Sequence, residues 1–217
     1  MNVAVTGSSG FVGRNLVSRL ERDGFNIIQL DLNNHIDLCD WSTLQSIPDF
    51  SILYHLAAKS FVPDSYKEPR AFYTTNLIST LNSLELCRMH NACFVLLSSY
   101  VYGAPLYLPI DEIHPTTAAN PYMNSKLMCE SLCSSYHRDF DIKVIIFRPF
   151  NIYGYGQSSQ FLIPHIISQI GTGKIRLKDP RPKRDFLHVI DVVDALAKIL
   201  NHSEIEFGIY NLGSGVS

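Results

Sequence analysis

The sequence predicts an α/β fold: a doubly wound parallel sheet flanked by helices, followed by a small C-terminal lobe. Short apolar segments alternate with longer amphipathic stretches, and a glycine-rich turn joins the first apolar segment to the first amphipathic one. Apolar segments of this kind are typical of strands buried on both faces. The chain has 217 residues, of which 46% are hydrophobic and 18% charged, so it is long enough to bury one large core.

The strands and helices of the main body follow one another in strict alternation. Five near-continuous apolar segments are expected to be strands: 2–6, 25–30, 51–56, 93–98 and 143–147. Three stretches between them carry helical periodicity: 11–23, 70–90 and 121–139. Pro69 and Pro121 stand where a helix can begin. This alternation predicts right-handed crossovers and a sheet covered by helices on both sides.

The composition changes after Pro149, where a connection rich in Gly, Asn, Gln and Tyr precedes a helix expected at about 160–171 and a polar run to 185. We expect 150–185 to form a partial substrate lobe over the C-terminal edge of the sheet. A further helix at about 189–201 and a strand at 208–213 should return to the main body. The domain assignment is therefore 1–149, with a later contribution from about 186–212.

Charge and cysteine usage narrow the class of partner. The formal net charge of −2 gives no bulk attraction to nucleic acid or to an anionic membrane. The chain starts directly with a strand, and neither a signal peptide nor an apolar run of membrane-spanning length is seen. Its five cysteines are an odd number without a Cys-x-x-Cys pair, which favours a reduced, cytoplasmic protein without a metal site. A small molecule is the expected partner.

The turn "TGSSGFVG" (6–13) has the features of a dinucleotide cradle in a Rossmann-type sheet. Gly7 permits a tight turn, Gly10 lets backbone amides approach a pyrophosphate, and Gly13 lets helix and strand pack closely. A strand precedes the triad and a helix follows it, as such a cradle requires. A structural glycine-rich turn is the alternative.

An acidic residue, Asp31, ends the second strand. A carboxylate there can accept hydrogen bonds from the adenosine ribose and repel a 2′-phosphate, so NAD is favoured over NADP. Arg14 is a nearby cation that could soften this preference, but we interpret it as a solvated helix residue. Asp37 could meet the adenine edge or simply form a turn, and both interpretations stay open.

Tyr122 and Lys126, in "NPYMNSK" (120–126), lie four positions apart on a predicted helix and therefore on one face. A free phenol titrates near pH ~10, and a neighbouring ammonium lowers that value, which would make the phenol a usable base. An ordinary exposed helix face is the alternative. Ser98 ends a buried strand at the edge where ligands of such sheets collect. Ser99 is the second candidate for the same role, and either serine could instead form a turn.

Six motifs occur in an order that resembles one enzyme family: "TGSSGFVG", "HLAA" (55–58), "LSSYVYG" (97–103), "NPYMNSK", "RPFNIYG" (148–154) and "RDFLHVIDVVDA" (184–195). Together they resemble the extended short-chain dehydrogenase/reductase family, in its NAD-dependent nucleotide-sugar epimerase/dehydratase branch. The resemblance covers essentially the whole chain.

The resemblance implies a role for each matching residue. Tyr122 would be the catalytic acid/base, Lys126 its partner, and Ser98 the hydroxyl that orients the sugar oxygen. The residues expected to bind NAD are Gly7, Ser9, Gly10, Phe11, Val12, Gly13, Asp31, Asp37, Leu38, Leu56, Ala57, Ala58, Asn76, Tyr122 and Lys126. The residues expected to bind the nucleotide sugar are Ser98, Ser99, Tyr122, Asn151 and Arg184, with Arg184 facing the diphosphate.

The resemblance also restricts the reaction. Related dehydratases carry acidic residues after the strand-end hydroxyl, whereas this chain has Ser99 and Tyr100, so dehydration is not expected. We expect an epimerase acting at C4 of a UDP-hexose through a transient 4-keto intermediate. A 4-ketoreductase or dehydrogenase of deoxysugar biosynthesis is the alternative, and a non-catalytic NAD(H)-binding regulator is a third possibility. Phe161 replaces an asparagine that some similar epimerases use for the phosphates, which leaves base and sugar open.

A homodimer is expected through the helices 70–90 and 121–139, which in the family often form a four-helix bundle. Their apolar faces could instead cover the sheet; they comprise Leu77, Leu81, Leu84, Leu127, Leu132 and Tyr136. The chain stops at 217, where similar proteins continue for tens of residues. The substrate lobe is therefore expected to be truncated or unusually short.

Overall fold

A six-stranded parallel sheet forms the centre of the computed structural model, which describes residues 1–177, 179–202, 204 and 206–216. Its strands are β1 (Asn2–Thr6), β2 (Asn26–Leu30), β3 (Ile52–His55), β4 (Cys93–Leu97), β5 (Val144–Pro149) and β8 (Phe207–Leu212). Their order in the sheet is β2-β1-β3-β4-β5-β8, and every neighbouring pair is parallel. The chain reverses its direction of progress between β1 and β3, and ligands of such sheets bind at the carboxyl ends beside that point.

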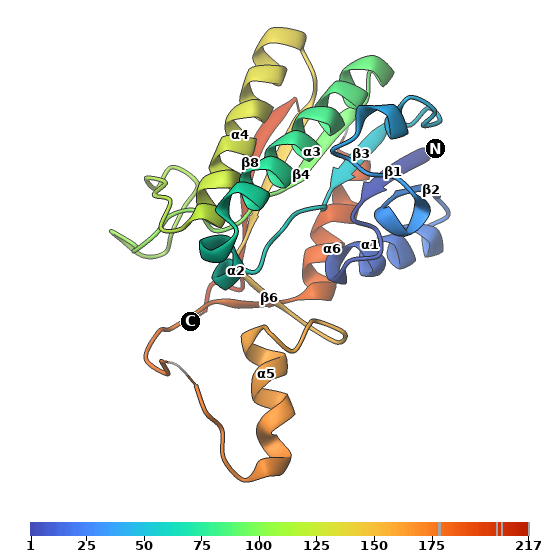
Figure 1. Cartoon of the computed structure of the whole chain (residues 1–217). Helices are drawn as coiled ribbons and strands as arrows, with labels where there is room; N and C mark the ends of the chain where they lie inside the picture. Colours follow the sequence, from blue (N-terminus) through green and yellow to red (C-terminus); the bar gives the residue numbers. More distant parts are fainter. Residues whose placement is uncertain (178, 203, 205, 217) are drawn as a thin grey trace.

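Helices cover both faces of this sheet, which confirms the predicted doubly wound α/β fold. The two helices on one face are α1 (Phe11–Arg22) and α6 (Val189–Lys198), and the two on the other are α3 (Pro69–His90) and α4 (Pro121–Phe140) (Figure 1). Each layer of helices encloses its own apolar core against the sheet. The inner strands β1, β3, β4 and β5 are buried on both faces because their side chains alternate between these two cores. The edge strands β2 and β8 keep several side chains exposed, so the expectation of burial on both faces is wrong for the segment 25–30.

The starts and ends of α3 and α4 follow from local sequence. Proline occupies the first turn of each helix, where its missing N–H costs nothing. The Asn120 side chain caps α4 by accepting a hydrogen bond from the Met123 N–H at 2.9 Å. Both helices end at a left-handed residue, Asn91 (φ 49°) and Asp141 (φ 56°), and such residues are common helix terminators.

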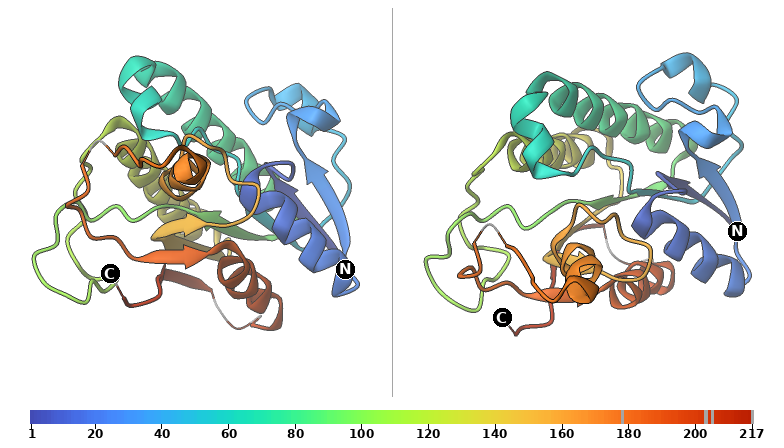
Figure 2. Two further views of the ribbon diagram at one scale, coloured as in Figure 1. Left: turned by 90° about the horizontal axis from the view of Figure 1, so that it is seen from below. Right: turned by 60° about the horizontal axis from the view of Figure 1, so that its bottom comes forward.

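A second, two-stranded sheet carries the predicted lobe. It pairs β6 (Asn151–Tyr153) with β7 (Phe186–His188) in parallel, and α5 (Leu162–Gln169) lies between them in the chain. Figure 1 shows α5 projecting away from the main sheet, and the left view of Figure 2 shows this helix end-on; Ile167 on α5 is 61% exposed. The lobe therefore presents an apolar helix to its surroundings.

Several short elements differ from the sequence predictions. The strands β6 and β7 and the helix α2 (Val62–Lys67) were not predicted, because three to six residues are too few to show a periodicity. The predicted helices at 160–171 and 189–201 each end in a 3₁₀ turn. Within the described ranges, the 3₁₀ helices are Leu32–Asn34, Trp41–Leu44, Ile170–Thr172 and Ile199–Asn201.

The long helices of this fold pack against the central sheet, as in other α/β proteins. Within the part of the chain that the structure describes, no helix combines the length and the apolar character needed to cross a lipid bilayer.

Candidate active site

The glycine-rich turn after β1 is shaped by close backbone contacts. Gly7 has a left-handed backbone (φ 61°), and its N–H donates to the Leu30 carbonyl at 3.0 Å. The Gly10 N–H donates to the Gly7 carbonyl at 3.0 Å. A Cβ atom on Gly13 would lie 2.0 Å from the Gly7 oxygen, so only glycine lets α1 approach the turn this closely.

This turn fits the pyrophosphate of a dinucleotide. Among the described residues, no side chain caps the N-terminus of α1 at Gly10, so the amides of the first turn remain available to an anion. The Ser8 hydroxyl is buried in the same turn and has no hydrogen-bond partner in the described part of the chain. Since a buried hydroxyl without a partner is costly, a phosphate oxygen is a suitable partner for it.

The ends of β1 and β3 are held together under the cradle by Thr6, which sequence reasoning missed. The Thr6 hydroxyl accepts hydrogen bonds from the N–H groups of Leu56 (3.1 Å) and Ala57 (3.2 Å), and it also lies 3.0 Å from Nδ1 of His55. A Cβ on Gly7 would lie only 2.9 Å from the Ala57 Cα. The end of β3 is therefore held beside the glycine turn, and the next three residues of the chain are Leu56, Ala57 and Ala58, which are partly buried.

The Asp31 carboxylate lies against the same turn. Its Oδ2 accepts from the Ser9 N–H (3.0 Å) and hydroxyl (2.7 Å), and its Oδ1 accepts from the Asn33 N–H at 2.9 Å. Burial raises the pKa of Asp31, but the hydrogen bonds from Asn33 and Ser9 outweigh it and hold the pKa below its ordinary value. The carboxylate is therefore charged at neutral pH.

Arg14 does not approach Asp31 in this structure. Its guanidinium donates from Nη2 to the Gly156 carbonyl at 2.5 Å, in the loop after β6. Arg14, which could have weakened the preference for NAD over NADP, is therefore hydrogen-bonded to a different part of the chain.

The remaining residues predicted for the cofactor take different positions. Phe11 and Val12 form the first turn of α1 and pack partly against the core. Asp37 adopts the turn role, because its carboxylate accepts from the Cys39 N–H at 2.9 Å. The Leu38 side chain is buried in the core on the α3/α4 face of the sheet.

Asn76 acts as a brace between three segments. Its side chain is buried, accepts from the Lys59 N–H (2.8 Å), and donates to the Lys59 carbonyl (3.1 Å) and the Ser125 hydroxyl (2.9 Å). Ser125 in turn donates to the Tyr122 carbonyl at 2.7 Å. Asn76, on α3, therefore connects the segment at Lys59 to the first turns of α4, next to Tyr122.

Tyr122 occupies the first turn of α4, with its ring edge-on to Phe72 at 6.5 Å. Burial raises the pKa of the Tyr122 phenol to about 12, a rise partly offset by a hydrogen bond with the Ser99 hydroxyl. Ser99 therefore influences this phenol, and the choice between Ser98 and Ser99 as the hydroxyl that orients the sugar stays a prediction.

Lys126 lies one turn further along α4 and is almost fully buried. Burial lowers the pKa of its ammonium, opposed by Cys129, Glu130 and Cys133. The lowering of the Tyr122 pKa by the Lys126 ammonium stays a prediction.

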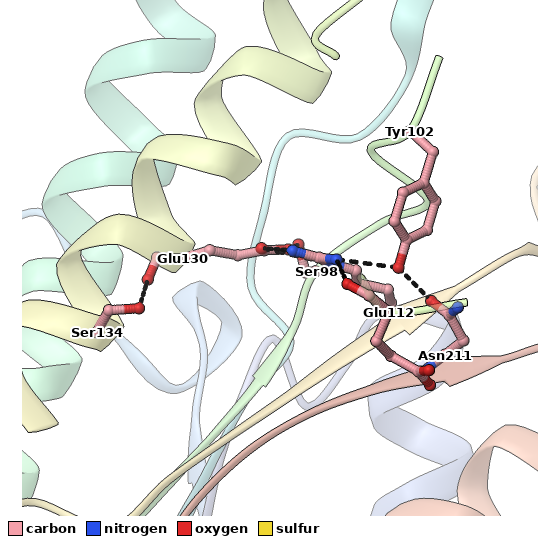
Figure 3. Close-up of polar contacts among 7 residues, drawn as sticks. Ser98, Tyr102, Glu112, Glu130, Ser134 and Asn211 are labelled. Carbon is pink, nitrogen blue, oxygen red and sulfur yellow. Dashed lines mark hydrogen bonds and ion pairs between the residues drawn. The ribbon is translucent and has the colours of Figure 1, made fainter. Parts of the chain in front are cut away.

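Ser98 belongs to a buried polar network rather than to the Tyr122 phenol (Figure 3). Its hydroxyl donates to Oε1 of Glu130 at 2.5 Å, and Glu130 forms an ion pair with Nη2 of Arg148 at 2.6 Å. Arg148 also donates to the Tyr102 hydroxyl at 2.9 Å, and Tyr102 donates to Oδ1 of Asn211 at 2.6 Å. This network ties α4 to β4, β5 and β8 directly below the candidate site.

Asn151 and Arg184, both predicted to bind the substrate, are brought together. Nη1 of Arg184 lies 3.4 Å from Oδ1 of Asn151 and 3.3 Å from the Tyr100 hydroxyl. The Asn151 amide donates to the Asp185 carbonyl at 3.0 Å. Arg184 is exposed, so its charge remains available to an anionic ligand.

The cysteine side chains do not form part of a metal site among the described residues. Burial raises the pKa of the Cys129 and Cys133 thiols, which keeps them neutral. Nowhere in the described ranges do three or more His, Cys, Asp or Glu side chains gather as a metal site would require.

Comparisons with known proteins agree with this geometry. Residues 3–213 match the model of the NAD dependent epimerase/dehydratase family. The chain is 35% identical to GDP-6-deoxy-D-mannose reductase of Pseudomonas aeruginosa, over 97% of this chain and 74% of the relative. It is 28% identical to UDP-glucose 4-epimerase 2 of Arabidopsis thaliana, over 99% of this chain and 76% of the relative.

A solved structure shows the same similarity in three dimensions. The UDP-glucose 4-epimerase of Thermus thermophilus, in complex with NAD, superposes with a TM-score of 0.84 and 27% identity, covering 98% of this chain and 78% of that chain. The resemblance inferred from the six motifs is thereby confirmed.

Proposed function

Because the chain belongs to the NAD dependent epimerase/dehydratase family, we propose that it is a nucleotide-sugar 4-epimerase that acts on a UDP-hexose through a transient 4-keto sugar. The observation that carries this proposal is the charged Asp31 carboxylate, held by Ser9 and Asn33 beside the glycine turn. It favours the ribose hydroxyls of NAD and repels the 2′-phosphate of NADP. A cofactor of this kind suits a reaction in which it is regenerated within each turnover.

The residues that would hold NAD are those around the turn. Gly7, Gly10 and Ser8 would bind the pyrophosphate, Asp31 the adenosine ribose, and Lys126 the nicotinamide ribose. When bound, NAD supplies an acceptor for the C4 hydride of the sugar and returns it in the second half of the reaction.

The proton is handled by Tyr122. Because the pKa of its phenol is about 12, Tyr122 holds its proton at neutral pH and can donate a hydrogen bond to the C4 oxygen. A positive charge brought near the phenol lowers this pKa and lets Tyr122 accept the C4 hydroxyl proton. Ser98 or Ser99 would orient that oxygen: Ser99 lowers the pKa of the phenol, and the Ser98 hydroxyl donates to Glu130.

The substrate would be anchored at its diphosphate by Arg184, with Asn151 beside it. Asn151 is itself fixed to Asp185, so the lobe contributes a preformed polar surface.

Incubation with UDP-glucose and no added cofactor tests this proposal. We expect UDP-galactose to appear, and we expect the variant Tyr122→Phe to bind UDP-glucose but to turn over roughly 10²- to 10⁴-fold more slowly, the contribution of one acid/base group. A protein in which Tyr122→Phe changes nothing would instead be a non-catalytic NAD(H)-binding regulator. No interconversion of UDP-hexoses or their N-acetylated forms contradicts the epimerase proposal.

A 4-ketoreductase is the second candidate, and the 35% identity to a GDP-6-deoxy-D-mannose reductase favours it. A reductase must exchange its cofactor after every turnover, whereas an epimerase can retain it. Consumption of NADH or NADPH with a 4-keto-6-deoxy sugar nucleotide, together with release of the cofactor on purification, would support the reductase.

We further propose that the protein is a cytoplasmic homodimer. All five cysteines are unpaired, which supports a reducing compartment. The helices α3 and α4 pack against each other, and Leu77, Leu81 and Leu127 keep part of their surface accessible while Leu84 is buried. A monomeric mass by light scattering at micromolar concentrations contradicts the dimer.

A further inference from the structure

Tyr100 lies between the two ends of the candidate site, although no role has been given to it above. On one side, Tyr100 directly follows Ser98 and Ser99 at the carboxyl end of β4. On the other, its hydroxyl lies 3.3 Å from Nη1 of Arg184. Tyr100 therefore joins the strand end that carries Ser98 and Ser99 to the Arg184 side of the site.

The Tyr100 ring is held in a defined orientation. It stacks on the Phe150 ring, with centroids 5.9 Å apart and planes inclined by 11°. Phe150 is fixed in turn, since its N–H donates to the Leu212 carbonyl at 2.8 Å. A Cβ on Gly213 would lie 3.2 Å from the Phe150 ring, so the end of β8 approaches this pair closely. Two stacked rings thus form a rigid wall, which lowers the entropic cost of any contact the phenol makes.

The Tyr100 hydroxyl has hydrogen-bonding capacity to spare. Its oxygen accepts from the Arg184 guanidinium, and no acceptor for its own O–H occurs among the described residues. A phenol whose oxygen accepts from a cation is a stronger donor, because the charge polarises the O–H bond. The ring is only partly buried, so this proton is accessible to a ligand.

We propose that Tyr100 is a substrate-binding residue that donates a hydrogen bond to an oxygen of the hexosyl group of a nucleoside diphosphate hexose. This inference rests on the proposed function and extends it. In that function Arg184 binds the diphosphate and Tyr122 transfers the proton at C4. Tyr100 would bind the sugar between them. The contact gives the protein a preference for a nucleoside diphosphate hexose over the bare nucleoside diphosphate.

Equilibrium binding to the NAD-saturated protein tests this inference, with UDP-glucose and UDP as probes in isothermal titration calorimetry. The variant Tyr100→Phe keeps the stacked ring and loses only the hydroxyl. We expect it to bind UDP-glucose about 3- to 10-fold more weakly, the usual loss for one hydrogen bond, and to bind UDP as the wild type does. Tyr107→Phe is the matched control, because it removes a phenol bound to Asp111 in an exposed loop.

A second variant separates the hydroxyl from the stack. Phe150→Leu leaves the Tyr100 hydroxyl in place but removes its support, so it should also reduce the preference for UDP-glucose over UDP. A Tyr100→Phe variant that keeps the full preference overturns the inference alone. A wild-type protein that binds neither probe overturns the proposed function, and this inference with it.

Discussion

The buried ion pair between Glu130 and Arg148 makes a quantitative prediction about stability. Both side chains are only 6% exposed, and the Arg148 guanidinium donates to both Glu130 oxygens, at 2.6 to 3.2 Å. The substitution Glu130→Gln keeps the shape but removes the negative charge, which leaves the Arg148 cation buried without a counter-charge. Breaking a buried pair in this way costs about 3–5 kcal/mol.

This cost translates into a measurable shift of the melting temperature. For a protein of this size, 1 kcal/mol corresponds to about 2–4 °C, so Glu130→Gln should lower Tm by roughly 6–20 °C. Thermal unfolding followed by circular dichroism measures the shift, and urea unfolding gives the free energy. Asp139→Asn is the matched control: it removes an exposed pair with Arg138, and Tm should barely change.

The double variant Glu130→Gln with Arg148→Met gives the coupling between the two residues. Because it removes both charges, it should be more stable than Glu130→Gln alone. If Glu130→Gln melts within about 2 °C of the wild type, the pair does not compensate a buried charge and the reasoning fails.

Three further predictions follow from single residues. Gly13→Ala should abolish NAD binding or destabilise the fold by at least about 2 kcal/mol, because its Cβ would collide with the Gly7 carbonyl; Gly171→Ala, with open space around it, should do neither, as calorimetry with NAD and thermal unfolding will show. Asp31→Asn should shift the NAD-to-NADP affinity ratio about tenfold toward NADP in fluorescence titrations, and an unchanged ratio contradicts the role given to this carboxylate. Burial lowers the pKa of His55 to about 3, so below pH ~6.5 the unfolded chain binds a proton that the folded protein does not bind. The free energy of unfolding, measured with urea, should therefore fall by about 2 kcal/mol from pH 8 to pH 5. The variant His55→Gln should lose this dependence of stability on pH.

The large elements and the cofactor cradle were predictable because each depends on local signals. The inner strands of the main sheet are apolar runs buried on both faces, and Pro69 and Pro121 mark where α3 and α4 begin. The glycine turn consists of three glycines between a strand and a helix, a combination that few structures other than a dinucleotide site require. Family motifs then placed Asn151 and Arg184 in one site, where the structure finds them in contact.

The parts that were not predictable depend on contacts between distant segments. Nothing in "LSSYVYG" says that Ser98 bonds to Glu130 while Ser99 meets Tyr122, because that choice depends on how α4 packs on β4. The burial of Lys126 likewise depends on how α4 packs against its neighbours, which no local signal in the sequence shows.

A similar limit applies to residues whose partners lie far away in the chain. Thr6 looked like an ordinary strand end, and its role as the link to Leu56 and Ala57 appears only when β1 and β3 are paired. Asp37 had two open interpretations; its hydrogen bond to the Cys39 N–H shows the turn, and a contact with the adenine stays a prediction.

Isotope retention tests the central claim most directly. UDP-glucose carrying deuterium at C4 is incubated with the purified protein and no added cofactor, and the product is analysed by mass spectrometry and NMR. A recycling 4-epimerase removes this deuterium and returns it to the same carbon, so the account predicts UDP-galactose that retains the label at C4. Product that has lost the label, or the absence of product from UDP-glucose and its N-acetylated form, would contradict it.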